Sequence, residues 1–173
     1  VSAFCDAGMD LLGPDSLMGF KHDMCLNLTT MLLIIAGGLG FPVWWDVINS
    51  IKQTITKKRT FRNGIRSLSL HSKLVLGFTA GLITVGTLGI YVLEKGNPGT
   101  LGEESLSDGL LMSAFQAVTL RTAGFCTMPQ QNLTEAGAFF SMLFMFVGGS
   151  PVGTAGGVKT TTIVVLVLTA WGL

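Results

Sequence analysis

Residues Met145 to Thr161 read MFVGGSPVGTAGGVKTT, and this stretch decides the fold. Six of the ten residues from 148 to 157 are glycine or proline: Gly148, Gly149, Pro151, Gly153, Gly156 and Gly157. Each glycine lowers helix propensity by about 1 kcal/mol and proline by about 3 kcal/mol, so a continuous helix is not expected here. The surrounding region from Ala136 to Leu173 contains a single charge, Lys159. Either a second span begins after Lys159, or one long helix is interrupted within the membrane.

The chain as a whole is also apolar. Of its 173 residues, 49% are hydrophobic and 12% are charged, and the mean hydropathy is +0.59, well above that of most soluble domains. Uncharged stretches run over Met24–Trp45, Leu74–Leu93 and Ala136–Val158. Each is long enough to cross a hydrocarbon core of about 30 Å, which needs roughly 20 helical residues. The sequence therefore predicts an all-α, multi-pass membrane protein.

A basic segment separates the first two uncharged stretches. Seven of the eleven Lys and Arg residues lie between positions 52 and 73, where there is no Asp or Glu. Short loops rich in Lys and Arg stay on the cytoplasmic side, so residues 51–73 are expected to be cytoplasmic and Glu94–Ser107 external. Seven cations would also suit nucleic acid or anionic lipid. A plain cytoplasmic loop is the favoured interpretation, and no nucleic-acid partner is expected.

The stretch Gly109–Leu120 is too short to cross. Its twelve uncharged residues make about 18 Å of helix at about 1.5 Å per residue. It is expected to be a re-entrant half-helix that dips in from outside, or an interfacial helix. Ser107 and Asp108 suit its outer, N-terminal end, where a hydroxyl or an acid satisfies free N–H groups.

Two segments of the chain share a motif. Cys5–Met9 reads CDAGM and Arg121–Phe125 reads RTAGF, and a later apolar span carries a Gly doublet in each case, Gly37-Gly38 and Gly148-Gly149. A non-helical return segment inside a membrane exposes backbone carbonyls, which are tolerated only when buried in protein or facing a water-filled path. Glycine permits the positive φ that such a return needs. The repeated unit therefore favours an ion pore.

At this point three segments resemble the Trk/Ktr family of potassium transporters: residues 2–11 (SAFCDAGMDL), 120–125 (LRTAGF) and, most specifically, 145–161. The resemblance implies a potassium-channel-like fold of membrane helix, re-entrant pore helix and membrane helix repeats. Residues 1–50 would be the end of the second pore loop and its following transmembrane helix, 51–73 a cytoplasmic basic linker, and 74–173 the third repeat with an interrupted second helix. With Val first and an apolar end, the chain is expected to be a piece of a longer protein.

The resemblance also implies site residues. Gly8 and Gly124 would belong to a selectivity filter whose backbone carbonyls bind potassium, the substrate, and the flanking filter positions would be Asp6, Ala7, Met9, Thr122, Ala123 and Phe125. The family more often has Asn at position 6 and Phe at position 9. A gate beneath the filter would consist of Gly148, Gly149, Ser150, Pro151, Gly153, Thr154, Gly156, Gly157 and Lys159. Because the filter lies elsewhere, shortening this loop is expected to leave potassium preference largely intact.

Partners follow from the same resemblance: a lipid bilayer, a second copy in a homodimer, and a cytoplasmic nucleotide-binding regulatory subunit. No covalently bound cofactor is implied. Arg121 sits at a depth where an unpaired charge is costly, so it is expected to have a partner, with Asp6 and Asp10 as candidates, or to reach water. Lys159 would either tether the obstructing loop or extend to the inner interface.

Other functions fit these residues less well. Residues 153–160 read GTAGGVKT, where the Lys does not directly follow the Gly that a phosphate loop requires. Ser150 lacks the G-x-S-x-G elbow, His22 and His71 lie outside the apolar spans, and the three cysteines have no CxxC spacing. An enzyme is therefore not expected. The alternative is a secondary transporter with a broken-helix midplane site for sodium or another small solute.

Overall fold

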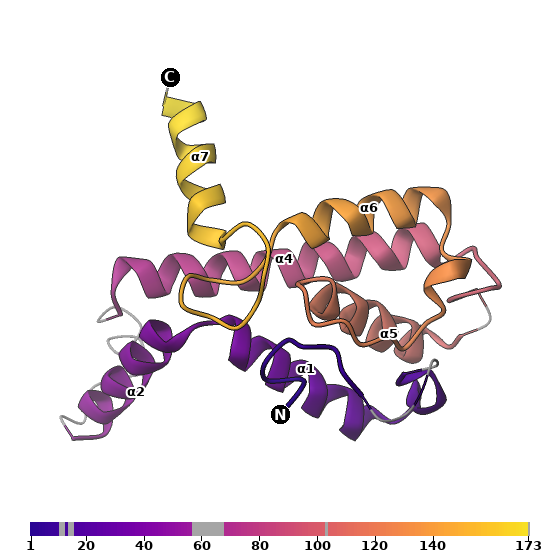
Figure 1. Ribbon diagram of the computed structural model, residues 1–173, viewed down its shortest axis with the longest axis horizontal. Coiled ribbons are helices and arrows are strands. Elements are labelled where there is room, and N and C mark those ends of the chain that lie inside the picture. Colours follow the sequence, from indigo (N-terminus) through magenta and orange to yellow (C-terminus); the bar gives the residue numbers. More distant parts are fainter. Residues whose placement is uncertain (11–12, 14–15, 57–67, 103, 173) are drawn as a thin grey trace.

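The computed structural model describes the chain except residues 11–12, 14–15, 57–67, 103 and 173. Five of the seven cations of the basic segment, those within residues 57–67, thus lie outside the described residues. Within the described part the elements are helical, and one isolated bridge joins Val147 to Val158. They are, in order, η1 (Met18–Phe20), α1 (Met24–Gly38), α2 (Phe41–Thr56), α4 (Leu70–Glu94), α5 (Leu106–Thr119), η2 (Gln130–Asn132), α6 (Glu135–Phe146) and α7 (Thr160–Gly172) (Figure 1). The all-α prediction is confirmed.

Helix α4 is the central element of the fold. Its 25 residues are long and apolar enough to cross a membrane, and among the described residues no other single helix is. It begins at Ser69, whose side chain accepts the N–H of Ser72, and it extends the predicted span Leu74–Leu93 at both ends. Helices α5, α6, α2 and α7 all pack against it. Ile90, Met112 and Phe144 form part of the buried core between α4, α5 and α6.

The first predicted span, Met24–Trp45, is not one straight helix, and this corrects the sequence prediction. Helix α1 ends at Gly38, and α2 begins at Phe41 after a bend of 102°. Gly40 has a φ of +80°, in the left-handed region that interrupts a helix. Pro42 has no N–H, which is tolerated only in the first turn of a helix. The side chain of Trp44 donates from Nε1 to the Ala36 carbonyl at 2.8 Å and so bridges the bend.

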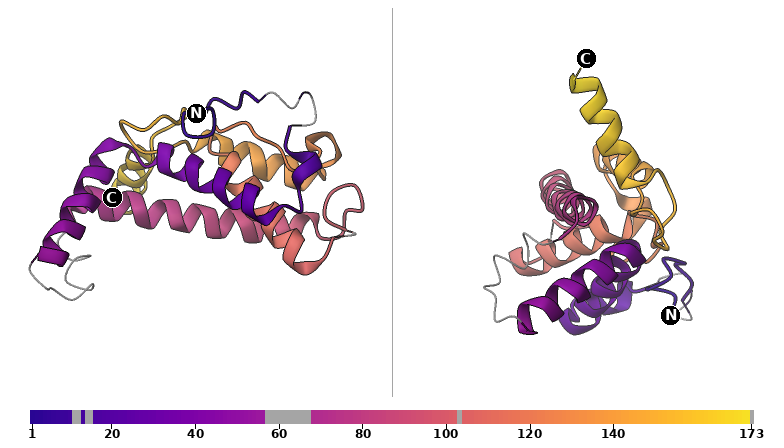
Figure 2. Two further views of the ribbon diagram at one scale, coloured as in Figure 1. Left: turned by 90° about the horizontal axis from the view of Figure 1, so that it is seen from below. Right: turned by 90° about the vertical axis from the view of Figure 1, so that its left-hand side faces the viewer.

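Helix α5 is the predicted half-helix, and it packs against both α1 and α4 (Figure 2). Its 14 residues give about 21 Å of helix. The cap differs from the prediction, because Ser105 occupies the N-cap and its side chain accepts the Asp108 N–H at 3.2 Å. Ser107 therefore lies inside the helix, and Asp108 places its charge in the first turn, where the helix dipole favours it.

The third predicted span, Ala136–Val158, also ends early, since α6 stops at Phe146. Residues 147–159, here called the Gly-rich loop, then form a closed loop before α7 starts at Thr160. Backbone hydrogen bonds join the two ends of the loop, here called its neck. They run from Gly148 N to Val158 O at 3.1 Å, from Val158 N to Phe146 O at 3.1 Å and from Thr160 N to Gly149 O at 3.0 Å. Helix α7 contacts α4 and projects away from the rest of the fold (Figure 1).

A buried carboxylate joins the end of α4 to the start of α6. Glu94 has no exposed surface. It accepts hydrogen bonds from Asn97 Nδ2 at 2.8 Å, Thr100 Oγ1 at 2.7 Å, and the backbone and side chain of Thr134 at 3.0 and 2.6 Å. Thr134 is itself the N-cap of α6. Glu94 therefore fixes where α6 begins relative to α4.

Candidate functional site

The two Ala-Gly motifs meet in backbone contact. A Cβ atom on Gly8 would lie 2.7 Å from the Ala123 carbonyl oxygen and 2.9 Å from Gly124 Cα. A Cβ atom on Gly124 would lie 3.0 Å from Gly8 Cα. Both glycines have positive φ, +65° and +86°. Neither position therefore accommodates a side chain without displacing the opposite strand.

The two segments that carry these glycines, Asp6–Met9 and Thr122–Phe125, are here called the glycine strands. Each shows the same alternation of backbone conformation. Asp6 and Thr122, two residues before the glycines, have φ values of +50° and +75°, while the alanines between them are not in the positive region. The sequence did not predict the conformation of Asp6 and Thr122. Asp tolerates positive φ, but for a β-branched residue such as Thr122 it is an outlier.

The remaining positions expected in the filter differ in burial. Met9 is 74% exposed, whereas Phe125 is 6% exposed and packs with Phe115 and Val118 in the core. Ala7 is exposed and Ala123 is fully buried. The two motifs, similar in sequence, thus occupy different environments in the described chain.

Arg121 lies next to Asp6 rather than Asp10. Arg121 is 5% exposed, and its Nε and Nη2 atoms have no hydrogen-bond partner among the described residues, nor does Asp6 Oδ1. Both side chains line a cavity of about 10 Å³, a volume suited to one water. The carboxylate of Asp6 is the opposite charge that acts on Arg121, while Asp10 accepts the Ser16 hydroxyl at 2.6 Å.

The Gly-rich loop attaches to the bend between α1 and α2. Ser150, fully buried, donates from its backbone N–H to the Gly38 carbonyl at 3.0 Å and from its hydroxyl to the Gly38 and Leu39 carbonyls. Thr154 N–H donates to the Gly37 carbonyl at 3.3 Å. The last carbonyls of a helix have no partner within it. The loop therefore supplies the donors that the end of α1 lacks.

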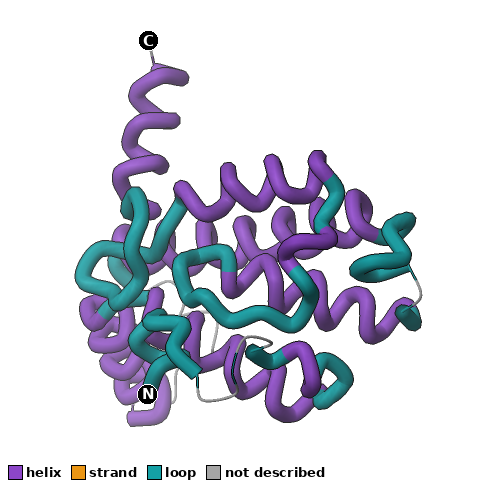
Figure 3. The backbone as a smooth tube through the Cα atoms, turned by 45° about the vertical axis from the view of Figure 1, so that its right-hand side comes forward, coloured by secondary structure: helices purple, strands orange, loops and turns teal. Residues whose placement is uncertain are grey.

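The same loop touches both glycine strands. Thr154 Oγ1 donates to Asp6 Oδ2 at 2.8 Å and also lies 3.1 Å from the Phe4 carbonyl oxygen. On the other strand, the Gly156 N–H donates to Thr122 Oγ1 at 2.9 Å. Figure 3 shows the N-terminal segment, the return after α5 and the Gly-rich loop, drawn as loops, on one side of the helices. The Gly-rich loop is therefore hydrogen-bonded directly to both segments, a contact that the sequence did not predict.

The other expected gate residues shape the loop itself. At the neck, a Cβ atom on Gly148 would collide with the Gly156 carbonyl oxygen, and Gly157 has a φ of +71°. A Cβ atom on Gly149 would meet Ala155 Cβ at 2.7 Å, and one on Gly153 would meet the Gly38 carbonyl oxygen at 2.9 Å. These glycines permit close backbone approach.

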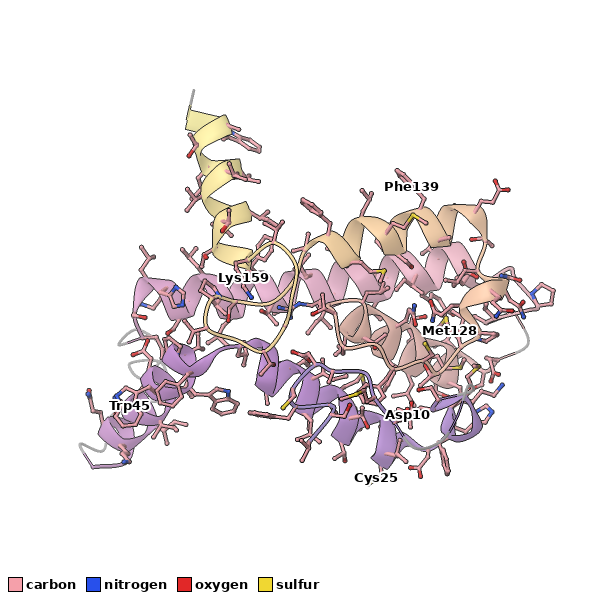
Figure 4. The ribbon with its side chains drawn as sticks, in the orientation of Figure 1. Asp10, Cys25, Trp45, Met128, Phe139 and Lys159 are labelled. Carbon is pink, nitrogen blue, oxygen red and sulfur yellow. The ribbon has the colours of Figure 1, made fainter. Side chains whose placement is uncertain are left out.

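Lys159 and Pro151 also lie within this loop. Lys159, placed where the loop returns to α7 (Figure 4), donates from Nζ to the Ala155 carbonyl at 2.7 Å. It thus holds the loop closed, as the tether alternative supposed. The Pro151 carbonyl oxygen faces Gly40, where a Cβ atom would approach it to 2.6 Å.

Sequence reasoning missed two polar groupings outside these strands. Gln116 and Gln130 pair through their amides at 2.9 and 3.0 Å, beside a cavity of about 550 Å³ between the return segment and α6. His22, Glu104 and Asp108 gather at the outer end of α5, with possible metal-ligand atoms within 4.8 Å of one another. Lys21 already forms an ion pair with Glu104 at 2.6 Å.

The fold and these strands define an all-α membrane transport protein. The chain belongs to the TrkH family, described as cation transport protein, whose model matches residues 1–171. A crystal structure of the potassium transporter TrkH from Vibrio parahaemolyticus shares the fold, with a TM-score of 0.71 and 20% identity over 98% of this chain and 33% of that chain. The resemblance seen in the sequence is confirmed.

Relatives at higher identity are uptake proteins. Ktr system potassium uptake protein B of Bacillus subtilis (strain 168) is 41% identical over 166 residues, covering 96% of this chain and 34% of that protein. Potassium/sodium uptake protein NtpJ of Enterococcus hirae is 36% identical over 168 residues, covering 97% of this chain and 34% of that protein. The chain thus spans about a third of the length of these relatives.

Proposed function

We propose that the protein containing this chain takes up potassium across the cell membrane. The strands Asp6–Met9 and Thr122–Phe125 form two sides of a selectivity filter, and the Gly-rich loop is the gate. The observation that carries this proposal is the backbone contact between Gly8 and Gly124, both at positive φ. Because the two glycine strands leave no room for side chains where they meet, their backbone carbonyls are the groups that can line an ion path there.

The chemistry suits a weakly hydrated monovalent cation. A potassium ion leaves its water shell only where oxygen atoms replace it, and rings of backbone carbonyls do this in potassium channels. The half-helix α5 ends at Thr119, just before the second strand, so the negative end of its dipole lies close to the return segment. Relatives whose names specify potassium uptake, or potassium and sodium uptake, support the same class of ion.

The gate follows from the position of the Gly-rich loop. Its side-chain and backbone donors contact Asp6 and Thr122, so a loop in this position lies next to the ion path. For the Gly-rich loop to leave this position, those hydrogen bonds and the ones to the Gly37 and Gly38 carbonyls must break. A loop held by a few hydrogen bonds suits two alternative arrangements.

Orientation and assembly complete the proposal. Residues 51–73 face the cytoplasm because of their cations, and α4 runs outward from there. The working unit is a homodimer of full-length subunits in the lipid bilayer, joined to a cytoplasmic nucleotide-binding regulatory subunit.

The test is uptake by the full-length protein in cells that lack their own potassium uptake. Gly8→Ser and Gly124→Ser each add a side chain where the opposite backbone lies within about 3 Å; we expect at least about tenfold lower potassium uptake or preference. Gly77→Ser on α4 is the matched control, because its Cβ would meet nothing within 4 Å. Wild-type uptake and preference in both filter variants would contradict the filter assignment, and uptake of sodium alone would contradict the substrate.

A further inference from the structure

Two residues of the glycine strands hold a left-handed backbone conformation, which Asp tolerates but which a β-branched residue rarely adopts. Asp6 and Thr122 both have positive φ without being glycine. Residues in sparsely populated regions persist only where the surrounding structure fixes them. The cost is largest for Thr122, because its side chain is β-branched.

The groups that hold these two residues come from one segment. Thr154 Oγ1 donates to the side chain of Asp6, and Gly156 N–H donates to the hydroxyl of Thr122, at 2.8 and 2.9 Å. The two bonds therefore reach equivalent positions of the two strands from neighbouring residues of the Gly-rich loop. No other hydrogen bond to the Thr122 hydroxyl is present within the described chain.

Building on the proposed function, we propose that Asp6 and Thr122 are positioning residues through which the docked Gly-rich loop sets the geometry of the filter. The loop then does more than obstruct the path. When it is docked, Thr154 and Gly156 hold both strands in the alternating conformation; when it leaves, both strands lose that support. Ion preference and gate position are linked, and linkage between two sites is reciprocal.

Thr154 and Thr122 are the residues to change. Thr154→Val and Thr122→Val keep the branched shape of the side chain and remove the hydroxyl, while Thr154→Ser and Thr122→Ser keep the hydroxyl. Asp6 is less suitable, because Arg121 faces it across a small cavity and would lose its neighbouring charge. Initial rates of potassium and sodium uptake are measured for each full-length variant.

We expect each Val variant to lower the preference for potassium over sodium by about fivefold, the loss that corresponds to one hydrogen bond, and each Ser variant to restore it. Thr154 tests the inference without altering the filter strands themselves, since its side chain is exposed and belongs to the loop. Ser150→Ala loosens the same loop at the α1–α2 bend and, because loop position and ion preference are linked, is expected to change flux and to lower the preference as well. Thr162→Val on exposed α7 is the control for general damage and is expected to change neither.

Wild-type preference in either Val variant would overturn the inference while leaving potassium uptake by the protein intact. A changed flux with wild-type preference in Ser150→Ala would also overturn it, because loop position and ion preference would then be independent. A wild-type protein that takes up no potassium would refute the proposed function itself, before any variant is compared.

Discussion

At the scale of single residues, burial and close approach decide which positions tolerate change. Gly8 and Gly124 have no room for a side chain, and Glu94 is fully buried with four hydrogen-bond donors around its carboxylate. A buried carboxylate is stable only when its oxygens are satisfied. Glu94 achieves this by joining two loops to the N-terminus of α6, so it contributes to stability.

Replacing Glu94 should therefore destabilise the fold. Glu94→Ala removes the acceptor of the Thr134 N–H and one acceptor each from the Asn97 and Thr100 side chains, at a cost of about 3 kcal/mol. Thermal unfolding of the full-length protein in detergent measures the effect. Glu135→Ala, an exposed acid in the first turn of α6, is the control and should cost less than about 1 kcal/mol. Equal melting temperatures for the two variants would contradict the role of Glu94.

At the scale of elements, the bend between α1 and α2 and the Gly-rich loop form one unit. The bend frees the carbonyls of Gly37 and Gly38, and the loop supplies the N–H and hydroxyl groups that bind them. Helix α2 then leads directly into the basic segment. A movement of α2 relative to α1 would therefore change the attachment of the loop.

A disulfide can test whether the loop moves. A Cβ atom on Gly38 would lie 3.9 Å from Ala155 Cβ, within the range of about 3.5–4.5 Å that a disulfide requires. In a background with Cys5, Cys25 and Cys126 replaced by Ser, Gly38→Cys with Ala155→Cys should lose most potassium uptake on oxidation and regain it on reduction. Each single Cys variant is the control. Equal uptake by the cross-linked and reduced forms would show that flux does not require the loop to leave α1.

At the scale of the whole molecule, charge is expected to set the orientation in the membrane. Helix α4 is the one described helix that is long and apolar enough to cross alone, and α1 with α2 qualifies only as a bent pair. The cations of residues 52–73 lie between them in the sequence. Both neighbouring helix ends are therefore expected on the cytoplasmic side.

Labelling with an impermeant thiol reagent checks this orientation. A cysteine at Gly96, which is exposed after α4, should react in intact cells, whereas one at exposed Lys52 on α2 should react only after the cells are opened. The same Ser background and the unlabelled parent serve as controls. The reverse pattern would invert the topology and place the entry to α5 in the cytoplasm.

The sequence by itself determined the helical membrane class, the two glycine positions and the interruption at residues 148–157. These are local properties: apolar length, glycine and proline content, and repeated motifs act through propensity and solvation. Only the tertiary structure decided the bend at Gly40, the positive φ of Asp6 and Thr122, the Glu94 contacts and the bonds from Thr154 and Gly156 to the glycine strands. The physical reason is that buried polar groups must find partners. Where a helix end, a carboxylate or a turn lacks them locally, the fold supplies them from distant segments that composition and spacing do not identify.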